Sequence, residues 1–138
     1  MSKKVRIGVL GAYRGSSMIN YCVSAGNATV VAICDKWEPA LKKQQEMHPD
    51  ESITYYTSFD EFINHDMDAV VLGCTHYPFA EKAVRKVLGD DVVIVDGGAG
   101  TARHTKRCLE ERGWLREEGS GTIAPFFTAW WYNLKLST

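Results

Sequence analysis

The segment VRIGVLG at residues 5–11 decides the fold. It is a short apolar run that ends in glycine. The following SSMINYCVSAG places Met18, Ile19, Cys22 and Val23 at helical spacing and stops at a second glycine. An apolar strand, a glycine turn and an amphipathic helix form the first part of a βαβ unit. The segment therefore predicts parallel strands joined by helices.

The rest of the chain repeats this strand-and-helix unit. The expected strands cover 29–35, 53–57, 68–72 and 92–95, and the expected helices cover 38–48, 58–65, 79–88 and 101–112. The strand at 68–72 is apolar enough to be buried on both faces, as in a parallel sheet. Short loops and right-handed crossovers predict an α/β fold, a doubly wound parallel sheet of order 3-2-1-4-5, with 121–128 available as a sixth strand.

Composition limits the class of protein. The chain has 138 residues, 45% of them hydrophobic and 24% charged, with a formal net charge of −1. These values predict one soluble globular domain over 1–138. We expect no nucleic-acid partner because there is no basic stripe, and no membrane partner because no apolar run reaches about 18 residues. MSKK leads directly into a strand without a signal peptide, which predicts a cytoplasmic protein.

The four cysteines do not form a CxxC pair. Three are expected to be small buried hydrophobes in helices or a strand: Cys22, Cys34 and Cys108. Cys74 differs because it follows a buried strand and precedes Thr75 and His76, where catalytic groups often lie in α/β sheets. We therefore predict catalytic roles for Cys74 and His76, and no metal site.

The first half contains IGVLGAYRGSSM, AICDKWEPAL and YTSFDEFINHDMDAVVL. Over about residues 4–72 it resembles the Gfo/Idh/MocA family of NAD(P)-dependent oxidoreductases. The resemblance implies a cofactor, NAD or NADP, with its pyrophosphate at the first turn of the helix and its ribose on Asp35. The cofactor-binding residues that it implies are Gly11, Tyr13, Arg14, Gly15, Ser16, Asp35 and Thr75.

The dinucleotide fingerprint is imperfect, because Tyr13 stands where the middle glycine is expected. The tyrosine ring either blocks the pyrophosphate or swings out and lets Arg14 or Ser16 reach it. Lys36 beside Asp35 leaves the choice between NAD and NADP open. The oxidoreductase family's catalytic lysine and substrate domain have no counterpart here.

The second half contains LGCTHYPF, VLGDDVVIVDGGAGTA and CLEERGWL. Over about 72–121 it resembles the C-terminal part of glutamate racemase, of the aspartate/glutamate racemase family. The resemblance implies that Cys74 is one of two cysteines that exchange the substrate's α-proton, and that His76 assists it. No other cysteine lies in a matching motif, and Gly97 replaces the family's serine.

These two resemblances predict a chain that changes family near Leu72. We expect one crevice at the carboxyl edge of the sheet, lined by Gly11, Tyr13, Arg14, Gly15, Asp35, Cys74, Thr75 and His76. The predicted function is an engineered or recombinant chimeric scaffold without catalytic activity. The alternatives are a residual module that binds NAD(P) or another nucleotide, and a cysteine-dependent racemase remnant. The aromatic tail at 122–138 predicts either an edge strand or self-association.

Overall fold

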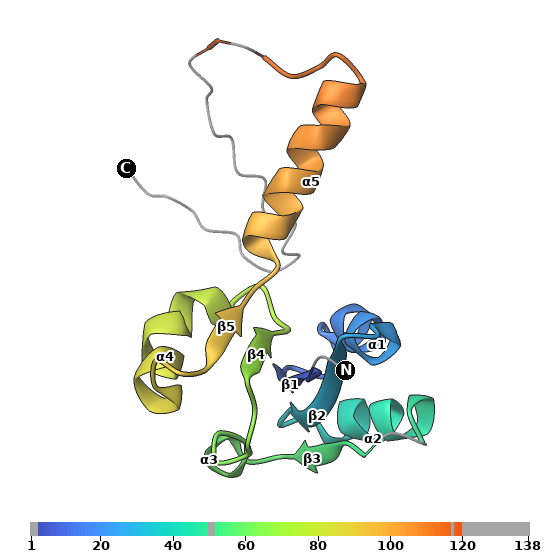
Figure 1. The fold of residues 1–138 in the computed structure, drawn as a ribbon, viewed down its shortest axis with the longest axis vertical. Helices are drawn as coiled ribbons and strands as arrows, with labels where there is room; N and C mark the ends of the chain where they lie inside the picture. Colours follow the sequence, from blue (N-terminus) through green and yellow to red (C-terminus); the bar gives the residue numbers. More distant parts are fainter. Residues whose placement is uncertain (1–2, 50–51, 117, 120–138) are drawn as a thin grey trace, which may run out of the picture.

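The computed structural model describes residues 3–49, 52–116 and 118–119. Five parallel strands form one sheet of order β3-β2-β1-β4-β5 (Figure 1). The strands are β1 (Val5–Leu10), β2 (Ala28–Cys34), β3 (Thr54–Tyr56), β4 (Ala69–Leu72) and β5 (Val93–Val95). The helices are α1 (Ser16–Ser24), α2 (Glu38–Met47), α3 (Phe59–Phe62), α4 (Glu81–Leu88) and α5 (Gly98–Glu111), with the 3₁₀ helix η1 (Tyr77–Ala80) before α4. The predicted fold class and strand order are confirmed.

The sheet is continuous across the point where the sequence resemblance changes. β4 pairs with β1 from Ile7↔Ala69 to Leu10↔Leu72, and with β5 over three registered pairs. All four residues of β4 are buried, which confirms the expected burial of this strand on both faces. The sixth strand predicted at 121–128 lies outside the described residues.

Two apolar clusters hold the helices on the two faces of the sheet. Ile19 of α1 and Leu41 of α2 pack with Val71 of β4 on one face. Phe62 of α3 packs with Val70 of β4 on the other face, where Leu88 of α4 also contributes. The sheet is therefore covered on both sides over its central strands.

The ends of several helices follow the sequence signals. Pro39 lies in the first turn of α2, and the Ser58 side chain accepts a hydrogen bond from the Glu61 backbone N–H. Gly113 follows α5 with a φ of 66°, a conformation that favours glycine after a helix. These signals fixed helix positions correctly because they act locally.

Two details of the predicted helices are wrong. The helix predicted at 79–88 is divided in the structure, with η1 over Tyr77–Ala80 and α4 over Glu81–Leu88, and Val84 is the buried residue of α4. α5 begins at Gly98, earlier than the predicted start at Thr101. The Asp96 carboxylate accepts the Gly98 N–H at 2.7 Å and starts the helix despite the low helix propensity of glycine.

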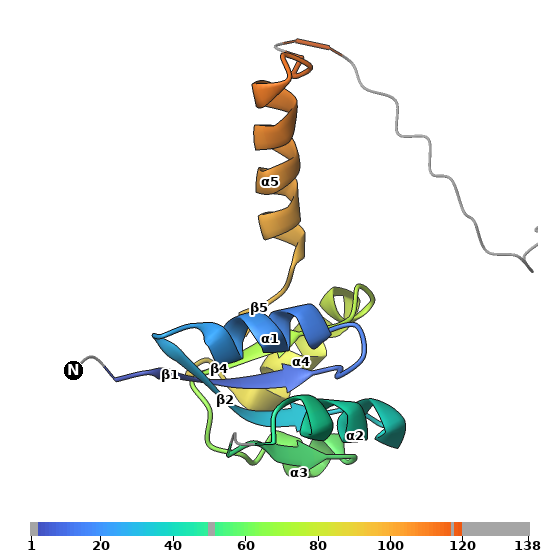
Figure 2. The ribbon, with the colours of Figure 1, turned by 90° about the vertical axis from the view of Figure 1, so that its right-hand side faces the viewer.

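α5 stands away from the sheet (Figure 2). None of its residues is buried, and Cys108 on this helix is only partly buried. The prediction that Cys108 is a core residue is therefore wrong, whereas Cys22 and Cys34 are buried as expected. No helix in the described part of the chain is long and apolar enough to cross a membrane.

Gly8 in β1 provides a test of core packing. A Cβ at this position would lie 2.9 Å from Phe62 Cζ and would also strike Met67 Sδ. Because Phe62 is fully buried, Gly8→Ala is expected to lower the free energy of unfolding by about 1–3 kcal/mol, measured by chemical denaturation. Gly26→Ala is the matched control, since nothing lies within 4 Å of its added Cβ. Equal stability of the two variants would contradict this packing.

Candidate functional site

Cys74 lies in the turn that follows β4, at the carboxyl edge of the sheet. The Gly73 N–H donates to the Leu10 carbonyl at 2.7 Å, and the Tyr77 N–H donates to the Cys74 carbonyl at 3.1 Å. The first bond ties the turn to β1, and the second closes it. Ligands of open α/β sheets bind at this edge, so the turn holds Cys74 where chemistry is possible.

Three glycines bring the turns after β1 and β4 into backbone contact. A Cβ on Gly73 would lie 2.5 Å from the Gly11 carbonyl oxygen and 2.9 Å from Gly15 Cα. Gly11 itself has a φ of 100°, which side chains rarely tolerate. The expected crevice is therefore filled by packed backbone where these glycines meet. Gly11 and Gly15 contact the turn that carries Cys74.

The cavity next to Cys74 opens toward β5. Its volume is about 610 Å³. Of the residues predicted to line the crevice, Arg14, Cys74 and Thr75 line this cavity. The other lining residues are Met18, Leu72, Gly73, Pro78, Gly97, Gly98, Thr101 and Ala102. The structure thus brings the glycine-rich turn, the cysteine turn and the first turn of α5 around one space.

The start of α5 was missed as part of the site. Its residues fall in the VDGGAGTA stretch that supported the racemase resemblance, and Asp96 follows β5 directly. Since β4 and β5 are parallel neighbours, their carboxyl ends meet at one edge. That adjacency was the signal that could have placed Gly98 and Thr101 beside Cys74.

His76 approaches the Cys74 thiol. Its Nδ1 lies 3.7 Å from Cys74 Sγ, within the range of a sulfur hydrogen bond. His76 is exposed and Cys74 is partly buried, so both are open to solvent or to a ligand. A histidine in contact with a thiol can take its proton and leave the thiolate, which is the reactive form of cysteine.

Asp35 lies on the other side of the glycine contact, away from the cavity lining. Its carboxylate accepts the Ala12 N–H at 2.8 Å and the Trp37 N–H at 2.9 Å. The Tyr13 ring meets the Trp37 ring edge-on, with centroids 5.3 Å apart. The Tyr13 side chain is 57% exposed, and the Arg14 guanidinium lies over its ring, 5.9 Å from the centroid.

Two other polar side chains lie at this edge. The Ser16 hydroxyl accepts a hydrogen bond from Gln44 Nε2 at 3.1 Å, which anchors the start of α1 to α2. Burial raises the pKa of the Tyr77 hydroxyl, and the nearby Asp35 and Cys74 raise it further. Tyr77 therefore stays neutral at physiological pH beside the cysteine turn.

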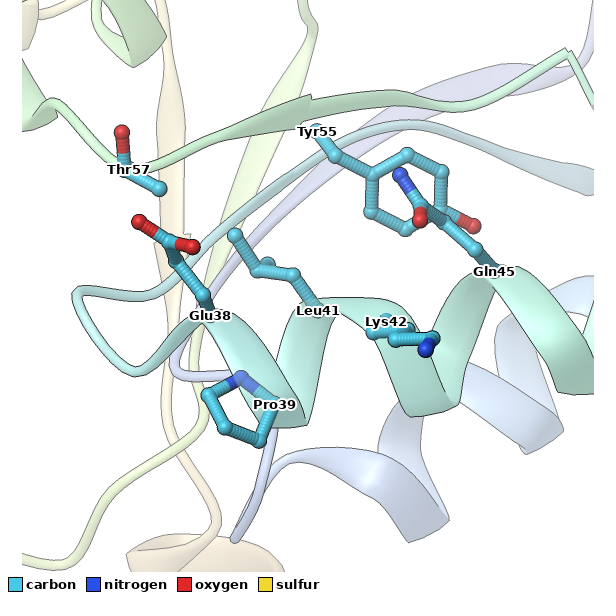
Figure 3. Close-up of a pocket in the computed structure, with 7 residues that line it drawn as sticks. All are labelled: Glu38, Pro39, Leu41, Lys42, Gln45, Tyr55 and Thr57. Carbon is cyan, nitrogen blue, oxygen red and sulfur yellow. The ribbon is translucent and has the colours of Figure 1, made fainter.

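A second cavity, of about 750 Å³, lies between α2 and β3 (Figure 3). Leu41 of α2 and Tyr55 of β3 both line it, and Glu38 and Thr57 lie at one end. The Tyr55 hydroxyl is buried and has no hydrogen-bond partner among the described residues. This cavity contains neither a thiol nor a histidine and matches none of the motifs in the sequence. Despite its larger volume, we place the candidate site at Cys74.

No family model matches the chain. The chain is 47% identical over 68 residues to a glutamate racemase of Clostridium botulinum, covering 47% of this chain and 26% of that protein. It is 31% identical over 117 residues to a glutamate racemase of Deinococcus radiodurans, covering 80% of this chain and 40% of that protein. The chain thus spans less than half the length of these curated relatives.

Solved structures give the same two likenesses. The WlbA dehydrogenase of Bordetella pertussis, solved in complex with NADH and UDP-GlcNAcA, has a TM-score of 0.55 at 25% identity. The match covers 68% of this chain and 28% of the WlbA chain. The glutamate racemase RacE1 of Bacillus anthracis has a TM-score of 0.54 at 24% identity. The match covers 85% of this chain and 46% of the RacE1 chain, which shows the shared fold. The chain resembles both kinds of protein. Both predicted resemblances are confirmed.

The prediction of an engineered scaffold without activity is wrong. The stretch after Leu72 is less than half of the chain, so a match over 80% of it to one glutamate racemase must extend well before Leu72. β4 also pairs in register on both sides of this point. The error arose because the glycine-rich strand-to-helix turn is a feature of a fold that both kinds of protein share, so it does not mark a join between two proteins. The comparisons show similarity to glutamate racemases on both sides of Leu72.

The exposure of the thiols can be tested by alkylation. At pH 8, iodoacetamide is expected to modify Cys74 and Cys108 and to spare Cys22 and Cys34. Burial is the main cause that raises the pKa of Cys34, to about 11, so this thiol stays protonated at pH 8. Peptide mapping by mass spectrometry measures the modification, and denatured protein, in which all four react, is the control. Modification of Cys34 as fast as Cys74 would contradict the structure.

Proposed function

We propose that the chain performs glutamate racemase-like chemistry, in which Cys74 removes and returns the α-proton of glutamate or a closely similar amino acid. The observation that carries the proposal is the thiol of Cys74, 3.7 Å from His76 and beside a cavity bounded by Arg14 and the start of α5. The similarity to curated glutamate racemases supports the choice of substrate.

The proton transfer needs no cofactor. His76 takes the Cys74 proton, and the thiolate then removes the proton from the substrate α-carbon. The electron pair of the broken C–H bond moves toward the substrate carboxylate. Cys74, now a thiol, exchanges its proton with water and returns one to the α-carbon. The thiolate, the histidine and the substrate are unchanged at the end of the cycle.

The cavity offers two positive elements for two carboxylates. Arg14 carries a guanidinium, which binds carboxylates through paired N–H donors. The first turn of α5 presents the positive end of the helix dipole. The Asp96 carboxylate accepts the Gly98 N–H and the Gly97 carbonyl accepts the Thr101 N–H, so the N–H groups that remain for a ligand in this turn are those of Ala99 and Gly100. A negative charge that grows on the substrate during proton removal is stabilised by these groups. Glutamate has the two carboxylates that this arrangement fits.

Cys74 is the single thiol in this cavity lining, and it faces the α-carbon from one side. A proton that leaves and returns on the same side is exchanged without inversion. Inversion requires a second acid on the opposite face. The proposed chemistry of this chain is therefore α-proton exchange, which is half of a two-base racemisation.

Exchange in D₂O tests the proposal. Incubation with L- or D-glutamate is expected to reduce the α-proton signal in the NMR spectrum, with the label confined to the α-carbon. Cys74→Ser is expected to slow this exchange by about 10²–10⁴-fold, because the serine hydroxyl is far less acidic than the thiol and stays protonated. Cys108→Ser, a thiol on the outer part of α5, is the matched control and should keep the rate. Exchange that survives in Cys74→Ser at the wild-type rate would overturn the proposal.

Binding of NAD or NADP is a second candidate function, supported by the likeness to the NADH-bound WlbA dehydrogenase. The residues fit this cofactor only in part. The turn at Gly11 suits it, but the Asp35 carboxylate already accepts the N–H groups of Ala12 and Trp37. The Tyr13 ring, in the position of the middle glycine, packs edge-on against the Trp37 ring, and we derive no reaction from this cofactor.

Calorimetric titration with NAD and NADP tests this candidate. Tyr13→Gly restores the middle glycine of the fingerprint and is expected to bind more tightly than the wild type. Asp35→Asn keeps one oxygen for the backbone N–H of Ala12 or Trp37 but removes the charge for the ribose, so it should bind more weakly. No saturable heat in any of the three proteins would exclude the candidate.

A further inference from the structure

Beyond its first turn, which lines the cavity beside Cys74, α5 is an amphipathic helix without a packing partner among the described residues. Its 14 residues include none that is buried. The residues at helical spacing along one side are small or apolar: Thr101, Ala102, Thr105, Cys108 and Leu109. The other side carries the ion pairs Lys106–Glu110 and Arg107–Glu111, at 3.7 and 3.8 Å. A helix with this pattern is stabilised by covering an apolar surface.

The sheet has an apolar groove of about 350 Å³ that no described helix covers. We call it the α1–β5 groove. Its walls are Met18 and Tyr21 of α1, and its floor includes Ile7 of β1, Val71 of β4 and Val95 of β5. Tyr21 is 75% exposed and Val95 is 41% exposed, so a large apolar area is open to solvent here.

The groove lies on the face of the sheet that lacks a helix beside α1. α3 and α4 cover the opposite face, where Ile94 of β5 packs against the cluster around Phe62. On the face with the groove, Val93 and Val95 remain exposed. Among the described elements, α5 is the helix that could cover them, yet it points away from its own sheet (Figure 2).

The connection between β5 and α5 is short and can turn. It consists of Asp96 and Gly97, and no atom lies within 4 Å of a Cβ added to Gly97. The Asp96 carboxylate holds the first turn of α5 through the Gly98 N–H, so the helix moves as a unit from this point. A helix that extends from a short hinge, with an empty groove on the same chain, is the arrangement from which domain-swapped dimers form.

We propose that α5 of one copy lies in the α1–β5 groove of a second copy, and that the exchange is reciprocal. In a two-fold dimer each chain gives one helix and receives one, so both unpartnered surfaces are buried at once. The side of α5 with Thr105 and Leu109 faces Val95 and Tyr21 of the other copy, and the charged side remains in solvent. This interface is separate from the self-association predicted for the aromatic tail.

Sedimentation velocity of the full chain at micromolar concentration tests the proposal. The wild type is expected to sediment as a dimer. Leu109→Asp on α5 and Val95→Asp in the groove are each expected to weaken dimerisation by about tenfold or more, because each buries a charge in the contact. His104→Asp on the charged side of α5 and Val87→Asp on exposed α4 are the matched controls and should remain dimers.

The other occupants of the groove give different results. A wild-type monomer would mean that α5 or the tail of the same chain covers the groove, which overturns the proposal. A dimer that persists in Leu109→Asp or in Val95→Asp would mean that copies meet through another surface, and it also overturns the proposal. Far-UV circular dichroism shows whether each variant is folded. If Leu109→Asp is a monomer that no longer melts cooperatively, α5 packs within its own chain. That result also overturns the proposal.

Discussion

The candidate site depends on the contact between Gly73 and the backbone of Gly11 and Gly15. This contact lets the turns after β1 and β4 approach until backbone touches backbone, with no room for a side chain at Gly73. It closes the carboxyl edge over β1 and β4, and the cavity beside Cys74 lies next to it, bounded by the start of α5. Cys74 follows Gly73 directly, and its position is therefore set by the packing of glycines.

The contact divides the edge into two regions with different chemistry. Toward β5 lie Cys74, Arg14 and the first turn of α5, which together offer a base and two positive elements around a cavity. Toward β2 lies Asp35, whose oxygens bind the N–H groups of Ala12 and Trp37. Proton transfer at an α-carbon uses the first region alone, whereas a dinucleotide needs the second. The arrangement of polar groups favours the first.

The sheet could be predicted from the sequence because its determinants are local. The apolar run at 5–11, the cap at Ser58 and the stop at Gly113 each specify a strand or a helix end without help from distant residues. The site was predicted only in part, since Cys74, Thr75 and Arg14 meet around one cavity but Asp35 does not line it. The Gly73 contact and the edge-on pairing of Tyr13 with Trp37 depend on approaches between distant segments, which no pattern in one segment reveals. The direction of α5 also depends on the surface available to it.

The central claim is that the cavity beside Cys74 holds an α-amino acid with two carboxylates. A ¹⁵N–¹H NMR titration of the uniformly labelled chain with L- and D-glutamate tests it most directly. The account predicts saturable shifts of the Thr75 and Gly98 backbone amides and of the Arg14 side chain, also in Cys74→Ser, which keeps the binding groups. Unchanged signals at these positions at millimolar glutamate, or shifts confined to the cavity around Lys42 and Tyr55, would contradict it.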